Sequence, residues 1–95
     1  MRFEWDDRKN KQNRRKHAVS FELAQEVFTD PLCLTIFDRM IDGEERFWAI
    51  GTVEDLLVLV VVHTVNNLRG EEVIRIISAR RATPRERKLY EKAEF

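Results

Sequence analysis

The sequence has little cysteine and little glycine, and each scarcity excludes a class of protein. Cys33 is the single cysteine, so no disulfide can form within the chain, which agrees with a reducing cytoplasm. Its apolar surroundings predict a core thiol rather than a nucleophile. The glycines are Gly43, Gly51 and Gly70 alone, which leaves no Walker or dinucleotide-binding motif. Nucleotide-binding enzymes of these classes are therefore excluded.

Patterns for metal sites and membrane spans are missing as well. One cysteine and two distant histidines match no zinc spacing, and the carboxylates form no EF-hand loop, so we expect no metal and no other cofactor. The apolar run at residues 56–62 is too short to cross a bilayer. Charged residues from Arg2 to Asp7 interrupt any signal-like segment at the start. We therefore expect a cytoplasmic protein without a membrane partner.

Size and charge predict one globular domain with a polar surface. Residues 1–95 can form a single modest core, and 43% apolar with 36% charged residues is typical of soluble proteins. The net charge is zero, but the ends of the chain are basic and residues 18–55 are acidic. Such a distribution can give one face that meets a polyanion and another that meets a protein, although many small domains are patchy without such a role.

The first third of the chain predicts a strand followed by two helices. Residues 3–6 alternate apolar and acidic side chains, as in a short edge strand. Asp6 or Asp7 can cap a helix that ends near His17 and is polar almost all round. Ser20 can cap a second helix. Its apolar residues recur at helical spacing and are expected in the core: Phe21, Ala24, Val27 and Phe28.

The rest of the chain predicts four strands and a last helix. The strands are expected at residues 33–37, 46–52, 56–65 and 74–81. Asp42–Gly43 is a strong hairpin-turn signal, whereas Asn66 to Glu72 is predicted to be a polar loop. The order β-α-α-β-β-β-β-α indicates an α+β domain, with an antiparallel sheet and helices gathered on one side of it.

Residues 74–87 join the last strand directly to the last helix. Alternation places Arg75 and Arg81 on one face and Arg80 on the other, unless a bulge intervenes. The helix N-terminus has an N-cap, a first-turn proline and a capping-box partner: Thr83, Pro84 and Glu86. Leu89 and Ala93 are expected to face the core. Arginines held beside a helix N-terminus suit phosphate binding, although exposed arginine on a strand edge is common without function.

These residue types are sufficient for RNA cleavage without a metal. The 2′-hydroxyl of RNA attacks its own phosphodiester, so a protein has to supply a base, an acid and positive charge. Histidine suits proton transfer at neutral pH, which makes His63 and His17 the possible groups. Trp5 and Tyr90 could stack on bases. RNA binding without cleavage would use the same residues.

Motifs from Phe3 to Tyr90 recur in an order that resembles a known family. The early motifs are Phe3-Glu4-Trp5-Asp6, Lys9, Asn13, Lys16-His17, Val19 to Ala24, Val27-Phe28 and Asp30. The later motifs are Arg46 with Ile50-Gly51, Val61-Val62-His63-Thr64, Arg75 to Arg80 with Ala82, and Glu86 with Tyr90. Together they cover nearly the whole chain and resemble the BrnT toxin family.

The resemblance implies a RelE-like fold and a bacterial type II toxin–antitoxin system. The toxin would be a ribonuclease that blocks translation, acting on RNA either free or on the ribosome. A BrnA antitoxin of ribbon-helix-helix type would neutralise it and carry the complex to operator DNA. Family members commonly have an arginine two residues after the His/Tyr-Thr pair, where this chain has Asn66. Either Arg69 reaches back from the loop, or the chain is a non-catalytic module that binds its antitoxin and helps repress the operon.

We therefore predict a ribonuclease site on this domain. Arg80 is the first choice for phosphate contact, with Arg75 beside it and His63 as general base or acid. The predicted RNA-binding residues are Arg81, Lys16, His17, Lys9, Arg69 and Tyr90. We expect Glu86 to act mainly as a helix cap. The acidic residues of the middle segment are expected to dock a basic part of the antitoxin: Asp42, Glu44 and Glu45.

Overall fold

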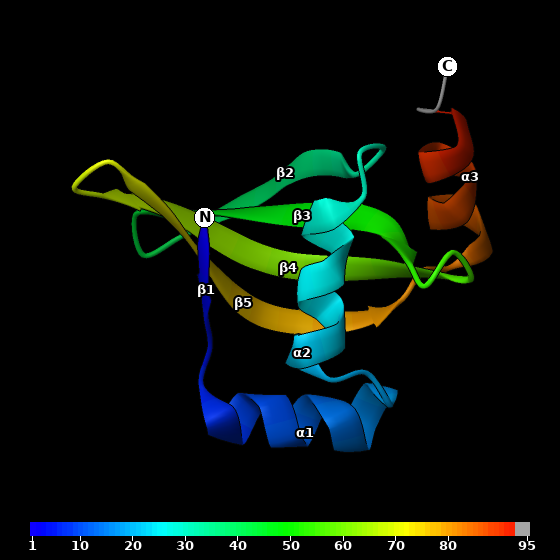
Figure 1. The fold of residues 1–95 in the computed structure, drawn as a ribbon, viewed down its shortest axis with the longest axis horizontal. Coiled ribbons are helices and arrows are strands. Elements are labelled where there is room, and N and C mark those ends of the chain that lie inside the picture. The colour runs from blue at the N-terminus through cyan, green and yellow to red at the C-terminus, as the bar shows by residue number, and fades with distance from the viewer. Residues whose placement is uncertain (93–95) are drawn as a thin grey trace.

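A twisted sheet of five strands, in the order β1-β5-β4-β3-β2, forms the centre of the molecule (Figure 1). β1 (Arg2–Glu4) runs parallel to β5 (Glu71–Arg81). The other neighbours pair antiparallel: β5 with β4 (Leu57–Leu68), β4 with β3 (Glu44–Val53), and β3 with β2 (Leu34–Ile41). The predicted α+β class and the antiparallel pairing of the four later strands are therefore confirmed.

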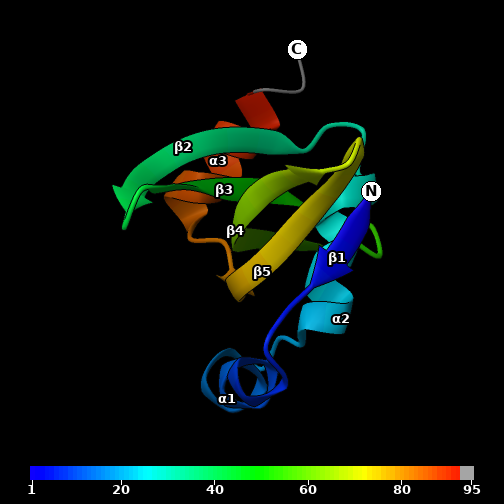
Figure 2. The same cartoon turned by 90° about the vertical axis from the view of Figure 1, so that its left-hand side faces the viewer.

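The helices are α1 (Asp7–His17), α2 (Phe21–Ala24), the 3-10 helix η1 (Gln25–Thr29) and α3 (Pro84–Lys92). This computed structural model describes residues 1–92. α2 and η1 cross the sheet in front of β3 and β4 (Figure 1), and α1 lies beyond the β5 side of the sheet, away from β2 (Figure 2). Within the described residues, no helix is long and apolar enough to span a membrane.

Alternation along the strands gives the sheet two faces. The covered face carries residues buried against α2 and η1, among them Ala49, Leu59, Val61 and Ala79. The open face carries Trp48, Ile50, Val60 and Arg80. α3 packs on the open face through Tyr90, so the prediction that all helices gather on one side is wrong. After β5 the chain leaves the sheet and continues into α3 (Figure 1).

The predicted helix starts are confirmed by their caps. The Asp6 carboxylate accepts hydrogen bonds from the amides of Arg8 and Lys9 at 2.8 and 3.2 Å. The Ser20 hydroxyl accepts one from the Leu23 amide at 3.0 Å. The second helix tightens into η1 after one turn, yet its inward stripe keeps the predicted spacing. The side chains of Phe21, Ala24 and Val27 are fully buried.

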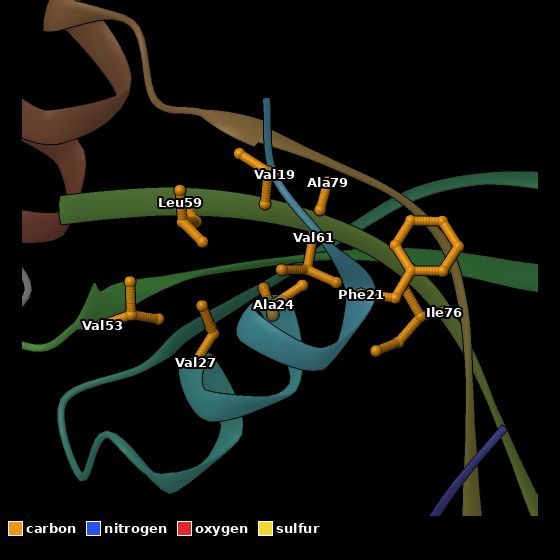
Figure 3. Packing of buried hydrophobic residues seen from close by; sticks show 10 residues of the cluster. Val19, Phe21, Ala24, Val27, Val53, Leu59, Val61, Ile76 and Ala79 are labelled. Carbon is orange, nitrogen blue, oxygen red and sulfur yellow. The ribbon is translucent and has the colours of Figure 1, made fainter. Parts of the chain in front are cut away.

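The main core lies on the covered face, beneath α2 and η1 (Figure 3). Its buried members are Val19, Phe21, Ala24, Val27, Ala49, Val53, Leu59, Val61, Ile76 and Ala79. Gly51 allows η1 to approach β3 closely, because a Cβ atom there would lie 3.0 Å from Cγ1 of Val27 and 3.2 Å from Oδ2 of Asp30. Burial of this apolar surface is the main favourable contribution to folding.

Strands β4 and β5 continue where the sequence predicted a loop. Asn66 pairs opposite Val73, and the turn is confined to Arg69–Gly70, with φ angles of 52° and 83°. Asp42–Gly43 closes the β2–β3 hairpin in the same way, with φ angles of 51° and 78°. Positive φ at both central residues is the type I′ pattern that fits the twist of a hairpin. Asn66, Asn67, Glu71 and Glu72 place polar side chains on both faces of these strand ends, so the sequence lacks the apolar alternation that would have predicted a strand there.

α3 is attached through Tyr90 rather than through Leu89. Leu89 is 46% exposed, so its predicted place in the core is wrong, and Ala93 lies outside the described residues. The Tyr90 hydroxyl donates to Oδ2 of Asp30 at 2.6 Å, and the Thr52 amide donates to the same oxygen at 2.9 Å. Burial acts to raise the pKa of Asp30, but these hydrogen bonds outweigh it and lower the pKa. The ionised carboxylate therefore links η1, β3 and α3.

A β-bulge in β5 changes which side chains share a face. Ser78 and Ile76 pair with consecutive residues of β4, so Ile77 is an extra residue in the ladder. An inserted residue reverses the alternation of side chains on the two sides of it. Arg75 and Arg80, which strict alternation would separate, therefore lie on the same face.

Candidate nucleic-acid interface

Three arginines project from the open face of the sheet. Arg46 is on β3, two residues before Trp48, and the bulge brings Arg75 and Arg80 of β5 to the same side. α3 packs over Ile50 at one end of this face and leaves the arginines partly accessible. The side chains of Arg75 and Arg80 are 40% and 34% exposed. Guanidinium groups that are accessible on one face can contact a phosphate backbone.

Arg80 is held in one orientation by Glu86. Its Nη1 and Nη2 atoms donate to the two Glu86 carboxylate oxygens at 2.7 and 2.8 Å, and the guanidinium lies 5.8 Å from the Trp48 ring centre. The hydrogen bonds from Arg80 lower the pKa of Glu86 to about 2 and raise the pKa of Arg80. Glu86 also accepts from the Thr83 amide at 2.8 Å, which confirms the predicted capping box. The charge of Arg80 is therefore balanced within the chain.

Arg75 connects the two long hairpins. Its Nη2 atom donates to Oε1 of Glu44 at 2.6 Å. The last paired residues of β3 and β4 are Phe47 and His63, and beyond them the β2–β3 and β4–β5 hairpins diverge (Figure 1). The salt bridge spans this divergence. Like Arg80, Arg75 has a carboxylate partner that an RNA phosphate would have to replace.

Arg46 differs from the other two arginines because it has no carboxylate partner among residues 1–92. Arg46 and Thr64 are the next residues on β3 and β4 after the last paired positions. The Nε atom of Arg46 and the Oγ1 atom of Thr64 are buried, and neither has a hydrogen-bond partner in the described chain. An unsatisfied buried polar group costs about 1–3 kcal/mol, so this end of the open face holds polar groups that the described chain leaves uncompensated.

A groove of about 260 Å³ lies between α1 and β5. Its lining residues are Lys9, Gln12, Asn13, Lys16, His17, Ile77 and Ser78. Three of the predicted RNA-binding residues, Lys9, Lys16 and His17, are therefore brought together. Ser78 pairs opposite Val62, two residues before Arg80 on β5, so the groove adjoins the arginine-bearing face.

Asn13 fixes α1 at the edge of β5 and so positions the groove. Its Nδ2 atom donates to the carbonyls of Val19 and Ala79 at 2.8 and 2.7 Å, and its Oδ1 atom accepts from the Ala79 amide at 3.1 Å. β1 pairs only with residues 73–75 of β5. The Asn13 side chain thus satisfies backbone groups that a longer neighbouring strand would otherwise pair.

His63 lies in the core rather than at the mouth of a cleft. It is 2% exposed and sits between the Phe28 and Phe47 rings, with centroid distances of 4.8 and 5.9 Å. Its Nδ1 atom is 3.2 Å from the Val61 carbonyl oxygen. Burial lowers the pKa of His63, so the ring is neutral at neutral pH. A substrate cannot reach the imidazole in this structure, and we leave His63 out of the proposed site.

The other predicted RNA-binding residues do not gather beside the three arginines of the open face. Arg81 is exposed and pairs opposite Leu59, whose side chain is in the covered core. Arg69 is in the exposed turn between β4 and β5, and Asn66 lies on the strand before it. Tyr90 is 4% exposed and bonded to Asp30, so its ring is not available for base stacking.

Sequence reasoning missed Arg46, Thr64 and the carboxylate partners of the other arginines. The alternation of Arg46 with Trp48 and Ile50 was a usable signal, but it did not show which side of the sheet remains accessible. Cys33 is half-buried, and burial raises the pKa of its thiol to about 11, so little thiolate forms at neutral pH. Within residues 1–92, no three His, Cys, Asp or Glu side chains gather in a metal-binding arrangement.

The fold and the arginine-bearing face define a small α+β protein suited to contact with a polyanion. Over residues 5–86 the sequence matches the family described as the ribonuclease toxin, BrnT, of type II toxin–antitoxin system. The chain therefore belongs to the BrnT family of ribonuclease toxins.

A solved structure supports the same assignment. The fold is similar to the 1.1 Å crystal structure of the Brucella abortus ribonuclease toxin BrnT, with a TM-score of 0.62 and 27% sequence identity. The similarity covers 87% of this chain and 97% of that protein. No curated protein sequence matches the chain significantly. Family and fold together indicate a ribonuclease toxin of a type II toxin–antitoxin system.

Proposed function

We propose that the open face binds the RNA backbone and that the adjoining groove supplies proton transfer, so that the chain cleaves RNA without a metal. The observation that carries this proposal is the bulge at Ile77. It places Arg75 and Arg80 on the same face as Arg46, beside the groove that contains His17. Guanidinium groups and a histidine side chain thereby lie on adjoining surfaces, and phosphodiester cleavage needs both positive charge and a proton carrier.

In the proposed reaction, the 2′-oxygen of RNA bonds to the adjacent phosphorus while the bond from phosphorus to the 5′-oxygen breaks. The products are a 2′,3′-cyclic phosphate and a 5′-hydroxyl. Arg46 meets the phosphate first because no internal carboxylate balances its charge, and Arg75 and Arg80 then exchange carboxylate oxygens for phosphoryl oxygens. His17, in place of the buried His63, accepts the proton of the 2′-hydroxyl and delivers a proton to the departing 5′-oxygen.

The cellular role follows from the family. We propose that cleavage inhibits translation in the bacterial cytoplasm, and that an antitoxin of the BrnA ribbon-helix-helix type neutralises the toxin. We assign contact with operator DNA to the antitoxin, as the resemblance to the family implies. Lys9 and Lys16 extend the positive surface along the RNA strand.

RNA cleavage by the purified protein in the presence of a chelator tests the proposal. Arg80→Ala is expected to lower the cleavage rate about 10²- to 10³-fold, since a positioned donor to the transition state is lost. Arg81→Ala is the matched control, because the neighbouring arginine pairs opposite a core residue, and its rate should stay near that of the wild type. Arg46→Gln provides a second test that leaves the pair of Arg80 and Glu86 intact. The substrate with a 2′-O-methyl group at the cleavage site should remain uncut.

Two results would contradict this mechanism. Cleavage by Arg80→Ala and Arg46→Gln at the wild-type rate would remove the open face as the phosphate site. A folded wild-type protein that cleaves no RNA and arrests no growth, yet binds its antitoxin, would support the alternative of a non-catalytic module. The replacement of the family arginine by Asn66, which lies two residues beyond Thr64 on the open face, favours that alternative.

A further inference from the structure

At one end of the sheet, no helix lies over the covered face. α2 and η1 lie across the middle of the sheet, and the β2–β3 and β4–β5 hairpins project beyond them (Figure 1). Phe37, Met40 and Val65 lie at this end and are 52%, 57% and 41% exposed. Phe37 pairs opposite Phe47, Val65 is two residues beyond His63, and Met40 lies on the same edge strand as Phe37. We call the residues Phe37, Met40, Phe47 and Val65 the hairpin patch.

The hairpin patch rests on a row of rings that continues into the core. Phe37 packs edge-on against Phe47 at 5.9 Å between ring centres, and Phe47 lies 5.9 Å from His63. The row continues from His63 to Phe28 at 4.8 Å and from Phe28 to Phe3 at 5.4 Å. The exposed Phe37 ring is therefore supported on one side by ordered neighbours. Aromatic side chains of this kind lose little entropy on binding and are common anchors of protein interfaces.

The β2–β3 hairpin, which carries Phe37 and Met40, is rich in acidic side chains. Residues 38–45 contain four acidic residues, Asp38, Asp42, Glu44 and Glu45, against the single basic residue Arg39. Asp38 and Glu44 are each paired with an arginine, and Asp42 and Glu45 form no ion pair within residues 1–92. An acidic rim repels RNA and attracts a basic protein segment. β2 is also an edge strand, whose backbone can pair with an added strand.

We propose that the hairpin patch is the surface on which the antitoxin docks. The partner segment places an apolar side chain against Phe37 and basic side chains near Asp42 and Glu45. This inference rests on membership of a type II toxin–antitoxin family and not on the cleavage mechanism proposed above. RNA and antitoxin then contact different surfaces of the chain, the arginine face and the hairpin patch.

Titration of the 95-residue chain with a BrnA-type antitoxin tests this assignment. Phe37→Ser is expected to weaken binding about 30-fold, the loss typical of a central anchor. Leu56→Ser is its matched control, because Leu56 is 80% exposed but lies at the opposite end of the sheet, between β3 and β4. Glu45→Lys should weaken binding about tenfold at low salt and less at high salt. Glu54→Lys, in the β3–β4 turn, should bind as the wild type does.

Cleavage of RNA by the same variants separates this proposal from the proposed function. Phe37→Ser and Glu45→Lys should keep the RNA cleavage rate of the wild type, while escaping neutralisation by the antitoxin. Unchanged antitoxin affinity in both variants would overturn the assignment. A concentration-dependent dimer that Phe37→Ser abolishes, with antitoxin binding intact, would assign the patch to a second copy of the chain and would overturn it too. A loss of RNA affinity in Phe37→Ser, with antitoxin binding intact, would also overturn the assignment.

Discussion

The two faces of the sheet are built from the same strands but hold different kinds of side chain. The covered face carries small and branched apolar residues such as Ala79 and Ile76, both at most 1% exposed. The open face carries Arg46, Arg75 and Arg80, of which the last two are paired with carboxylates. The comparison shows that one strand, β5, serves both purposes. The β5 residues on the covered face pack in the core, and those on the open face can contact a ligand while the core stays unchanged.

The contrast also explains the roles of the two histidines. His63, on the covered face, is packed between rings and is neutral, whereas His17 lines the groove beside the open face. Changes on the covered face are therefore expected to alter stability, and changes on the open face to alter RNA binding or cleavage. The following substitutions test this division, from the largest expected effect to the smallest.

Asn13→Leu should have the largest effect on stability. The substitution removes three hydrogen bonds and leaves the Ala79 amide and carbonyl buried without partners, which costs about 3 kcal/mol. Gln12→Leu changes an exposed neighbour on α1 and should cost less than about 0.5 kcal/mol. Urea unfolding of both variants measures the difference. Equal midpoints would show that Asn13 does not hold α1 to β5.

Gly51→Ala should destabilise the covered face by overpacking. The added methyl group would meet Cγ1 of Val27 at 3.0 Å and Oδ2 of Asp30 at 3.2 Å, and these neighbours would have to move by a few tenths of an ångström to admit it. The expected cost is about 2 kcal/mol in the free energy of unfolding. Thr35→Ala is the control, because it makes a similarly small change in side-chain size at an exposed position on β2. A thermal midpoint for Gly51→Ala equal to that of the wild type would contradict the tight contact between η1 and β3.

His63 should make stability dependent on pH in the mildly acidic range. Burial lowers its pKa in the folded state, so below the unfolded value of about 6.5 the unfolded chain binds a proton that the folded chain does not. Stability is therefore full above that pH and falls as the pH decreases, by up to about 1.4 kcal/mol per unit. His63→Phe should abolish this dependence between pH 7 and 5 in urea unfolding, and His17→Gln should retain it.

A slope that survives in His63→Phe would assign the dependence to another group. The lowered pKa values of Asp30, Glu22 and Glu86 are not a competing source in this interval. A carboxyl group with a lowered folded pKa loses its stabilising effect only as the pH falls below its unfolded value, near or below about 4.3.

Glu44→Gln should have the smallest effect on stability and a gain in RNA affinity. The salt bridge to Arg75 is partly exposed, so its loss should cost less than about 1 kcal/mol. In this variant Arg75 does not have to break a salt bridge before it binds a phosphate. The affinity for uncleavable 2′-O-methyl RNA should therefore rise about threefold to tenfold. Glu71→Gln, which removes the exposed partner of Arg2, is the matched control. Equal RNA affinities in the two variants would exclude Glu44 as an internal competitor.

Much of the local structure could be predicted because its signals are local. Asp6, Ser20 and Thr83 cap the helices as their side chains predict, and Asp42–Gly43 forms the expected hairpin turn. Apolar spacing also identified the buried stripe of the second helix. Part of the site was accessible in the same way, since residues separated by seven or eight positions on one helix, such as Lys9, Lys16 and His17, share a groove.

The fate of His63 and Arg46 depended on partners that are distant in the chain. His63 was expected at a strand end, but β4 continues beyond it and the Phe28 and Phe47 rings bury it. The role proposed for Arg46 depends on its position relative to Thr64 and on the divergence of the β2–β3 and β4–β5 hairpins. No local pattern around either residue contains this information.

The helix caps, the Asp42–Gly43 turn, the apolar stripe of the second helix and membership of the family follow from the amino-acid sequence, because each depends on residues near one another or on a recurring motif. The bulge at Ile77, the place of α3 on the open face, and the position of Arg75 and Arg80 on the same face as Arg46 depend on the folded chain as a whole. Strand register and helix placement are set by the packing of the whole core, and a shift of one residue is enough to move a side chain from one face to the other.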